Sequence, residues 1–248
     1  MIDNDTLTRL RLMRLSGMAN ALEHLAEQPV ELGRLTAPQI VAMAVDWEWE
    51  RRRDAKLLKL RKNARLAQPQ ALITDLTGSK GRIIDLEFIS RLATGTYIAK
   101  HQDVIIQGPT GTGKTFVACA LANAACQQYR TVLYLTAADL FDRLCLAEAT
   151  DTKASALDTL AKAELLVIDD WFLTPPTKEQ VRNLHTLIDR RHRTGSTIFA
   201  TQLGPGNWHD RIEEKIVADA IIDRITSNAH TTKLDGEVSL RRQFNSLT

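Results

Sequence analysis

The segment Gly108–Thr115 constrains this chain more than any other part of its sequence. It reads Gly-Pro-Thr-Gly-Thr-Gly-Lys-Thr and fits the phosphate-binding pattern G-x-x-x-x-G-K-[ST]. The glycines let backbone N–H groups point at one centre, and the positive end of the following helix adds to their field. An apolar run, Asp103–Gln107, precedes the loop, and a helical pattern, Phe116–Gln128, follows it. This strand–loop–helix context predicts a site for the phosphates of a nucleotide.

Two side chains at the end of the loop have expected chemical roles. Lys114 can reach the β- and γ-phosphates, and the hydroxyl of Thr115 can bind Mg²⁺. The rest of the loop contributes its backbone to phosphate binding, and its residues are Gly108, Pro109, Thr110, Gly111, Thr112 and Gly113. A nucleoside triphosphate and Mg²⁺ are therefore the expected cofactors.

Composition excludes several classes of protein. The chain is 44% apolar and 25% charged, as in an ordinary globular protein, and it has no apolar stretch long enough to cross a bilayer. Its first residues lack the basic-then-apolar order of a secretion signal, so we expect a cytoplasmic protein. Three scattered cysteines and six histidines without ligand spacing predict neither a disulfide framework nor a zinc site.

Short apolar runs alternate with helical patterns in the C-terminal part of the chain. The strand candidates are Val104–Gln107, Thr131–Leu135, Leu165–Asp169, Ser196–Thr201 and Thr231–Leu234. Such alternation predicts an α/β domain with a mostly parallel five-stranded sheet, helices on both faces, and a ligand site at the carboxyl ends of the strands.

The N-terminal part is expected to be a small all-helical domain. Leucines and methionines recur at helical spacing from Leu7 to Leu25, and Pro29 is expected to end that segment. A second helix is expected from near Thr36 to about Leu66. The predicted organisation is a helical domain over 1–68, a loose connector over 69–81 and the α/β domain over 82–248.

Acidic and polar side chains follow two of the predicted strands. Asp169 and Asp170 end an apolar strand, where one carboxylate can hold the magnesium shell and the next can orient the attacking water. The alternative is a buried strand followed by a solvated acidic turn. Gln202, with Thr201 as second candidate, follows another strand and could touch the γ-phosphate and the water. A polar strand end at a turn is the alternative there.

Arg224 lies on a predicted amphipathic helix, Ala218–Ile225. An arginine that reaches a neighbouring subunit's γ-phosphate stabilises the charge of the transition state. Periodicity alone favours a simpler interpretation, a surface arginine paired with an acid such as Asp223.

A strongly basic run covers fifteen positions from Arg51 to Arg65, with eight cations against the single acid Asp54. A solvated helix face is the usual explanation of such a run, but pairing along one helix does not balance this excess. We therefore expect sequence-neutral contact with duplex DNA phosphates. The predicted contacts are Arg51, Arg52, Arg53, Lys56, Lys59, Arg61, Lys62 and Arg65.

Together these features resemble the AAA+ ATPases of the IstB and DnaC type, and more closely the IstB helper ATPases of insertion-sequence transposons. The resemblance is carried by the phosphate loop, Leu165–Asp170, the strand exit Ala200–Leu203, and a C-terminal region. In that region the matching segments, in order, are Asn207–His209, Val217–Ile225, Ser227–His230 and Leu234–Glu237, ahead of Arg241.

The resemblance implies a magnesium-dependent, DNA-stimulated ATPase that binds ATP. Such a helper assembles as a homo-oligomer on duplex target DNA, deforms it and recruits or activates a transposase, and ATP hydrolysis controls its disassembly. Arg224 is then the arginine finger, acting in trans, and Lys114, Asp170 and Gln202 complete the catalytic set with Asp169 and Thr115 on the metal. Arg241 or Arg242 is a further phosphate contact that no motif places.

The chain also departs from the family pattern. Asp170 stands where many AAA+ proteins have glutamate, and Gln202 where many have asparagine. Too little chain follows Arg224 for a C-terminal helical lid. A DnaC-like loader of a replicative helicase is the main alternative function. A nucleotide kinase and an architectural DNA-coating protein with little turnover are the more distant alternatives.

Overall fold

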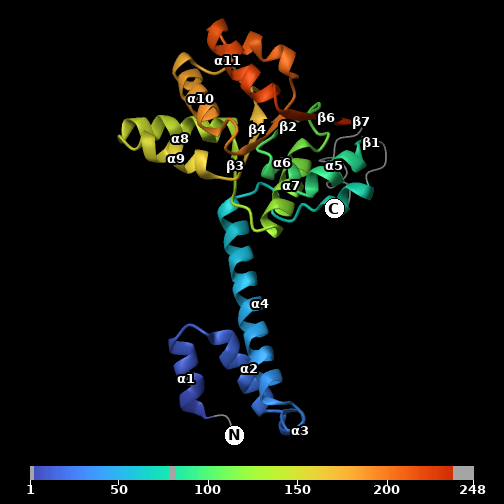
Figure 1. The fold of residues 1–248 in the computed structure, drawn as a ribbon. Helices are drawn as coiled ribbons and strands as arrows, with labels where there is room; N and C mark the ends of the chain where they lie inside the picture. The colour runs from blue at the N-terminus through green and yellow to red at the C-terminus, as the bar shows by residue number, and fades with distance from the viewer. Residues whose placement is uncertain (1–2, 79–81, 237–248) are drawn as a thin grey trace, which may run out of the picture. The chain divides into compact units, whose positions relative to one another are not determined.

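The computed structural model describes residues 3–78 and 82–236, and the chain divides into two compact units, Met1–Lys59 and Leu60–Thr248 (Figure 1). The first unit is helical, as expected. Its helices are α1 (Asn4–Leu12), α2 (Ser16–Ala26), α3 (Pro29–Leu32) and α4 (Ala37–Ala64), of which the last continues into the second unit.

The prediction of one helical segment from Leu7 to Leu25 is wrong. Arg14 adopts a left-handed backbone conformation with φ 62°, and this breaks the segment into α1 and α2. The break lets the two helices pack against each other and bury Leu7 and Leu25. Pro29 does not only follow α2 but also opens α3, where its fixed φ and missing N–H suit the first helical position.

Glu48 joins α4 to α2 inside the first unit. This buried carboxylate accepts hydrogen bonds from the backbone N–H of Gly17 at 2.6 Å, from Arg51 at 2.7 Å and from Arg52 at 2.6 Å. The hydrogen bond from Arg51 is the main cause that lowers the pKa of Glu48 to about 2. Two cations of the basic run therefore have an acidic partner, which precedes the run in sequence.

The second unit contains the predicted five-stranded sheet. Its strands lie in the order β3-β4-β5-β2-β6, and every neighbouring pair is parallel. The strands are β2 (Asp103–Gln107), β3 (Val132–Thr136), β4 (Leu165–Trp171), β5 (Ser196–Thr201) and β6 (Ala229–Lys233). Strands β2, β4 and β5 are apolar and buried because helices cover both faces of a parallel sheet.

Helices pack on the two faces as the alternating pattern predicts (Figure 1). One face is covered by α7 (Lys114–Gln127), against which α5 (Leu86–Ala93) packs. The other is covered by α8 (Ala137–Ala149), α9 (Lys153–Lys162), α10 (Lys178–Arg191) and α11 (Lys215–Thr226). The short elements are η1 (Ile73–Gly78), α6 (Thr96–Ala99), η2 (Pro205–Asn207), η3 (His209–Arg211), and the antiparallel pair β1 (Arg82–Ile83) and β7 (Asp235–Gly236).

The segment after α4 is better anchored than a loose connector. The side chain of Asn123 on α7 donates hydrogen bonds to the carbonyls of Pro69 at 3.0 Å and Ala71 at 2.8 Å. Ala71 and Leu76 are buried. The part of this segment before residue 79 therefore packs on the α/β unit.

Within the described residues, which end at Gly236, no helix follows α11, in line with the expected lack of a C-terminal helical lid. Arg241 and Arg242 lie outside the described residues. No helix in the described part of the chain is long and apolar enough to span a membrane.

Candidate nucleotide-binding site

The phosphate loop lies between β2 and α7, at the carboxyl edge of the sheet. Gly113 precedes α7 with φ 97°, a left-handed conformation that glycine adopts without strain. A Cβ atom on Gly108 would lie 2.5 Å from the carbonyl oxygen of Leu234. Leu234 in turn donates its N–H to the carbonyl of Gln107 at 2.7 Å. The chain after β6 therefore lies against the start of the loop, and only glycine fits there.

The ammonium of Lys114 is held inside the loop. Its Nζ atom donates to the carbonyl of Pro109 at 2.9 Å, and the hydroxyl of Thr112 donates to the same carbonyl at 2.9 Å. Lys114 is 7% exposed. An incoming phosphate meets a cation already pointed into the loop and competes for it with a neutral carbonyl oxygen.

Asp169 and Thr115 meet at the end of β4. Thr115 donates its hydroxyl to Oδ2 of Asp169 at 2.6 Å, and Tyr134 on the neighbouring strand β3 donates to the same oxygen at 2.8 Å. The backbone N–H of Asp170 donates to Oδ1 of Asp169 at 2.9 Å. Burial, and then the charge of Asp169, raise the pKa of Tyr134 well above its usual range, so its hydroxyl stays a donor.

This arrangement fits a magnesium ion. A hydroxyl and a carboxylate in contact are the hard oxygen ligands that Mg²⁺ takes from proteins, and substrate phosphates and water supply the remaining positions. Among the described residues no cluster of three or more His, Cys, Asp or Glu side chains competes as a metal site. Thr115 and Asp169 would hold the ion.

The structure brings two further predicted catalytic groups to this place. Asp170 and Gln202 line one small cavity together with Lys114 and Thr115. Asp170 is exposed, whereas Asp169 is 3% exposed. The two neighbouring acids thus differ in exposure: Asp169 is buried and held by hydrogen bonds, and Asp170 is open to solvent.

The loop that carries Asp170 has an unusual backbone. Asp170 and Phe172 both have φ 53°, and the N–H of Leu173 closes the turn on the carbonyl of Asp170 at 3.1 Å. Left-handed backbone at residues other than glycine costs free energy and persists only where the surroundings hold it.

Aromatic packing holds this loop. Trp171, Phe172, Phe199 and Trp208 form one buried cluster, with ring centroids 4.3 to 6.1 Å apart. The hydroxyl of Thr201 donates to the carbonyl of Trp171 at 3.1 Å. Thr201 is fully buried and binds this loop, which leaves Gln202 as the side chain at the cavity.

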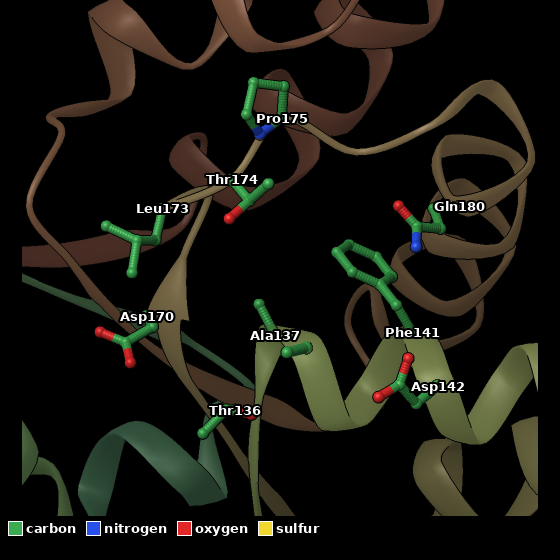
Figure 2. Close-up of a pocket in the computed structure, with 10 residues that line it drawn as sticks. Thr136, Ala137, Phe141, Asp142, Asp170, Leu173, Thr174, Pro175 and Gln180 are labelled. Atoms are coloured by element: carbon green, nitrogen blue, oxygen red, sulfur yellow. The ribbon is translucent and has the colours of Figure 1, made fainter.

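A second cavity, of about 320 Å³, begins beside Asp170 (Figure 2). Phe141 and Asp142 of α8 line one side, and the loop from Leu173 to Pro175 lines another (Figure 2). Leu173 is 52% exposed. The side of the site that bears Asp170 is therefore open to a group from outside the chain.

Arg224 does not lie at the site of its own chain. Its guanidinium pairs with Asp189 at 3.1 Å and donates to the carbonyl of Ala220 at 3.0 Å. Asp189 stands near the end of α10, which runs from the carboxyl edge of the sheet back to the amino edge. The helix rises about 16 Å between Lys178, at its start near the carboxyl edge, and Asp189. Arg224, which pairs with Asp189, therefore lies far from the carboxyl edge, where the phosphate loop is. The acid partner is Asp189, where the sequence suggested Asp223.

The eight cations predicted to contact DNA are all exposed. Arg51 and Arg52 also bind Glu48 and the carbonyl of Arg14. Seven of the eight positions lie on α4, where at 100° per residue they surround the helix and do not form one stripe, and Arg65 follows the helix end with φ 52°. Contact of these residues with DNA stays a prediction.

Sequence reasoning missed Tyr134 and the aromatic cluster. Tyr134 stands two residues before the end of β3, and β3 pairs with the acid-bearing strand β4. The available signal was a tyrosine near the carboxyl end of a strand that neighbours the acid-bearing strand. No pattern in the sequence indicated that Trp171 and Phe172 pack into the aromatic cluster that holds the loop of Asp170.

The phosphate loop, the acid at the end of the strand two places along the sheet, and the strand order define a P-loop protein of the AAA+ type. Solved structures share this fold. The crystal structure of DnaI covers 67% of this chain and 92% of its own at 22% identity, with a TM-score of 0.57. The DnaC helicase loader covers 71% and 98% at 17% identity, with a TM-score of 0.55.

The chain belongs to the family of IstB-like ATP binding proteins, which it matches over residues 8–248. A putative insertion sequence ATP-binding protein of Sinorhizobium fredii is 36% identical over 98% of both chains. The putative ATP-binding protein of insertion sequence IS1162 from Pseudomonas fluorescens is 36% identical over 82% of this chain and 87% of its own. The corresponding protein of IS21 from Pseudomonas aeruginosa is 28% identical over 93% and 85%.

Proposed function

We propose that this protein is a magnesium-dependent ATPase that assembles on duplex DNA in the cytoplasm and helps a transposase at its target. The contact between Thr115 and Asp169 carries the first part, because it joins the phosphate loop to the acid-bearing strand at 2.6 Å. Family membership supports the link to insertion sequences.

The groups at the site divide the work of hydrolysis. Lys114 and the loop backbone bind the β- and γ-phosphates, and Asp170 accepts a hydrogen bond from the attacking water. Gln202, which lines the same cavity as Lys114, contacts the γ-phosphate in this proposal. Magnesium, when bound, neutralises charge on the phosphate oxygens. The side chain of Asp170 is one methylene shorter than the glutamate of many AAA+ proteins, and the left-handed turn sets the direction of its carboxylate in this proposal. The aromatic cluster keeps that turn in place.

Arg224 acts on a neighbouring subunit in this proposal. Arg224 pairs with Asp189 at the end of α10 that is far from the carboxyl edge, and this separation from its own chain's site supports action in trans. The cavity beside Asp170 offers an entrance for the arginine of a neighbouring subunit. In this proposal the same assembly deforms the target DNA and recruits or activates the transposase.

The variant Arg224→Ala is expected to bind ATP normally and to lose turnover about 10³-fold, since a trans arginine contributes on that order. Mixing it with Asp169→Asn, which keeps Arg224, should restore part of the turnover because some interfaces then contain one intact site and one intact arginine. Steady-state ATPase assays on the single and mixed proteins measure this.

Asp189→Asn is the control for a purely structural role of Arg224. It removes the exposed ion pair, worth about 0–1 kcal/mol, and should leave turnover unchanged. Equal loss of turnover in Asp189→Asn, or no recovery on mixing, contradicts the trans arginine.

DNA binding by α4 is best tested at Lys59 and Lys62, which lie on one side of the helix and not at Glu48. The double variant Lys59→Glu, Lys62→Glu should weaken binding to a duplex and reduce the slope of log K against log salt by about 2, close to 0.9 per phosphate contact. Fluorescence anisotropy across a salt series measures the slope.

The matched control is Lys178→Glu, Arg182→Glu on α10, which makes the same change in net charge on exposed helix positions. An equal effect of both pairs would show that net charge alone matters, and an unchanged slope in the α4 variant would remove α4 from the DNA interface.

A further inference from the structure

A cavity of about 400 Å³ lies at the amino edge of the sheet, away from the phosphate loop. It is lined by residues of α5 and α6, by Gln102 just before β2, and by His230 in β6 (Figure 1 shows these elements together). The phosphate loop follows the opposite end of β2, whose five residues span about 16 Å. The cavity is therefore separate from the nucleotide site.

Its lining is cationic. Arg91 in the last turn of α5 and Lys100 just after α6 are both exposed, and His230 is half-buried. None of the residues that line the cavity is an aspartate or a glutamate. Two positive charges, Arg91 and Lys100, without an acid in the wall favour an anionic ligand.

The aromatic ring of Phe88 contacts both the Arg91 guanidinium and the His230 imidazole in the wall of the cavity. The guanidinium carbon of Arg91 lies 5.7 Å from the centroid of the Phe88 ring, and the His230 ring meets Phe88 edge-on at 6.1 Å. Gln102 donates its amide to Asn228 at 3.3 Å, so its oxygen accepts from Nε2 of His230 at 3.1 Å. This network fixes the orientation of the imidazole ring at the cavity.

The positive surface continues along the same edge. Lys100 precedes β2, Arg193 precedes β5 and Lys162 precedes β4, and all three are exposed. Neighbouring strands lie about 4.8 Å apart, so these positions follow one another across the edge. The nearby acids Glu164 and Asp158 are engaged with Arg130 and Arg190. An extended row of cations suits a chain of phosphates better than a single carboxylate.

We propose that this cavity binds a backbone phosphate of a polynucleotide, with Arg91 and Lys100 as its charged contacts and His230 beside them. Arginine and lysine supply the charge-assisted hydrogen bonds that phosphate oxygens accept. The identification of the polynucleotide as DNA rests on the proposed function. The cavity adds a contact on the α/β unit to those proposed for α4.

The first test uses the full-length protein and a labelled DNA duplex in a salt series. Arg91→Ala, Lys100→Ala should reduce the slope of log K against log salt by about 1–2, whereas Lys178→Ala, Arg182→Ala, with the same loss of charge, should not. ATPase turnover without DNA should be unchanged in both. A wild-type slope in the Arg91, Lys100 variant, or an equal loss in the control, overturns the proposal.

The second test does not depend on duplex binding. The side-chain NMR signal of His230, identified through His230→Gln, is followed with a non-hydrolysable ATP analogue saturating the phosphate loop. A 5′-phosphorylated thymidine dinucleotide should shift it, and thymidine should not. A shift with inorganic phosphate or excess free nucleotide but not with the dinucleotide identifies a free-phosphate site and overturns the polynucleotide assignment. No shift with any of them overturns the cavity as a phosphate site.

The two proposals can fail separately. A wild-type protein that binds no duplex but shows the His230 shift refutes the DNA-assembly proposal and keeps the cavity. If duplex affinity depends on Lys59 and Lys62 but not on Arg91 and Lys100, the DNA-assembly proposal stands and the cavity proposal is refuted.

Discussion

Replacing Asp169 by asparagine is expected to lower ATP turnover about 10³-fold, equivalent to roughly 4 kcal/mol, while ATP still binds. Oδ2 of Asp169 accepts hydrogen bonds from Thr115 and Tyr134, and Oδ1 accepts one from the N–H of Asp170. An asparagine amide would turn an NH₂ group toward one of these donors and remove the negative charge that would hold the magnesium ion in the proposed site. Single-turnover hydrolysis and a separate measurement of nucleotide binding distinguish the two effects.

Tyr134→Phe is a milder change at the same site than Asp169→Asn. It keeps the carboxylate of Asp169 and removes one of its donors, and partners of metal ligands typically contribute 10–100-fold to metal affinity or activity. Turnover should therefore fall about 10–100-fold, with a higher magnesium requirement. Full activity in Asp169→Asn would contradict the assignment of the metal position, and full activity in Tyr134→Phe would limit Tyr134 to packing.

Replacing Arg191 by methionine is expected to destabilise the α/β unit by about 3–5 kcal/mol, since it leaves buried polar groups without a partner. The buried guanidinium donates to the carbonyls of Leu160 and Ala163 at 2.8 Å and of Ala161 at 3.2 Å, where α9 ends. It also binds the carbonyl of Ser196 and the hydroxyl of Thr197 at the start of β5. One side chain thus ties a helix end to the central sheet.

The charge of Arg191 lies near that of Asp103. Burial lowers the pKa of Arg191 to about 10, and burial raises the pKa of Asp103 to about 7, against the hydrogen bond from the N–H of Thr197 at 2.6 Å. Methionine fills similar space but satisfies none of these groups. Arg190→Met is the matched control, because Arg190 makes an exposed ion pair with Asp158 worth about 0–1 kcal/mol.

Thermal unfolding measures the difference. The Arg191 variant should melt about 10 °C lower than the wild type, and the Arg190 variant within about 3 °C of it. Equal melting temperatures for the two variants would show that the carbonyls at the end of α9 find other partners.

Much of the α/β unit could be predicted from sequence because its signals are local. Val104–Gln107 and Ser196–Thr201 are short β-branched runs bounded by turn residues, and the structure confirms both as central strands. The phosphate loop has a fixed spacing between its glycines and its lysine. The position of Asp169 beside Thr115 followed from parallel strands whose carboxyl ends share one edge.

The parts that could not be predicted depend on contacts between distant residues. The left-handed turn at Arg14 breaks a continuous helical pattern that leucine spacing alone supports. Tyr134 reaches Asp169 only because of the register between β3 and β4. Glu48 lies three residues before Arg51, and its partner on α2, the N–H of Gly17, lies 31 residues away. No local pattern encodes such pairs.

The short segment after α4 has a structural consequence. Gln68 lines the small cavity at the phosphate loop, and it follows the end of α4 at Ala64 by four residues, which span at most about 14 Å when extended. Asn123 clamps the next residues onto α7, the helix that begins at Lys114. The last residues of α4, from Leu60 to Ala64, belong to the same unit as the phosphate loop, and this short connection ties the end of that helix closely to the wall of the phosphate-loop cavity.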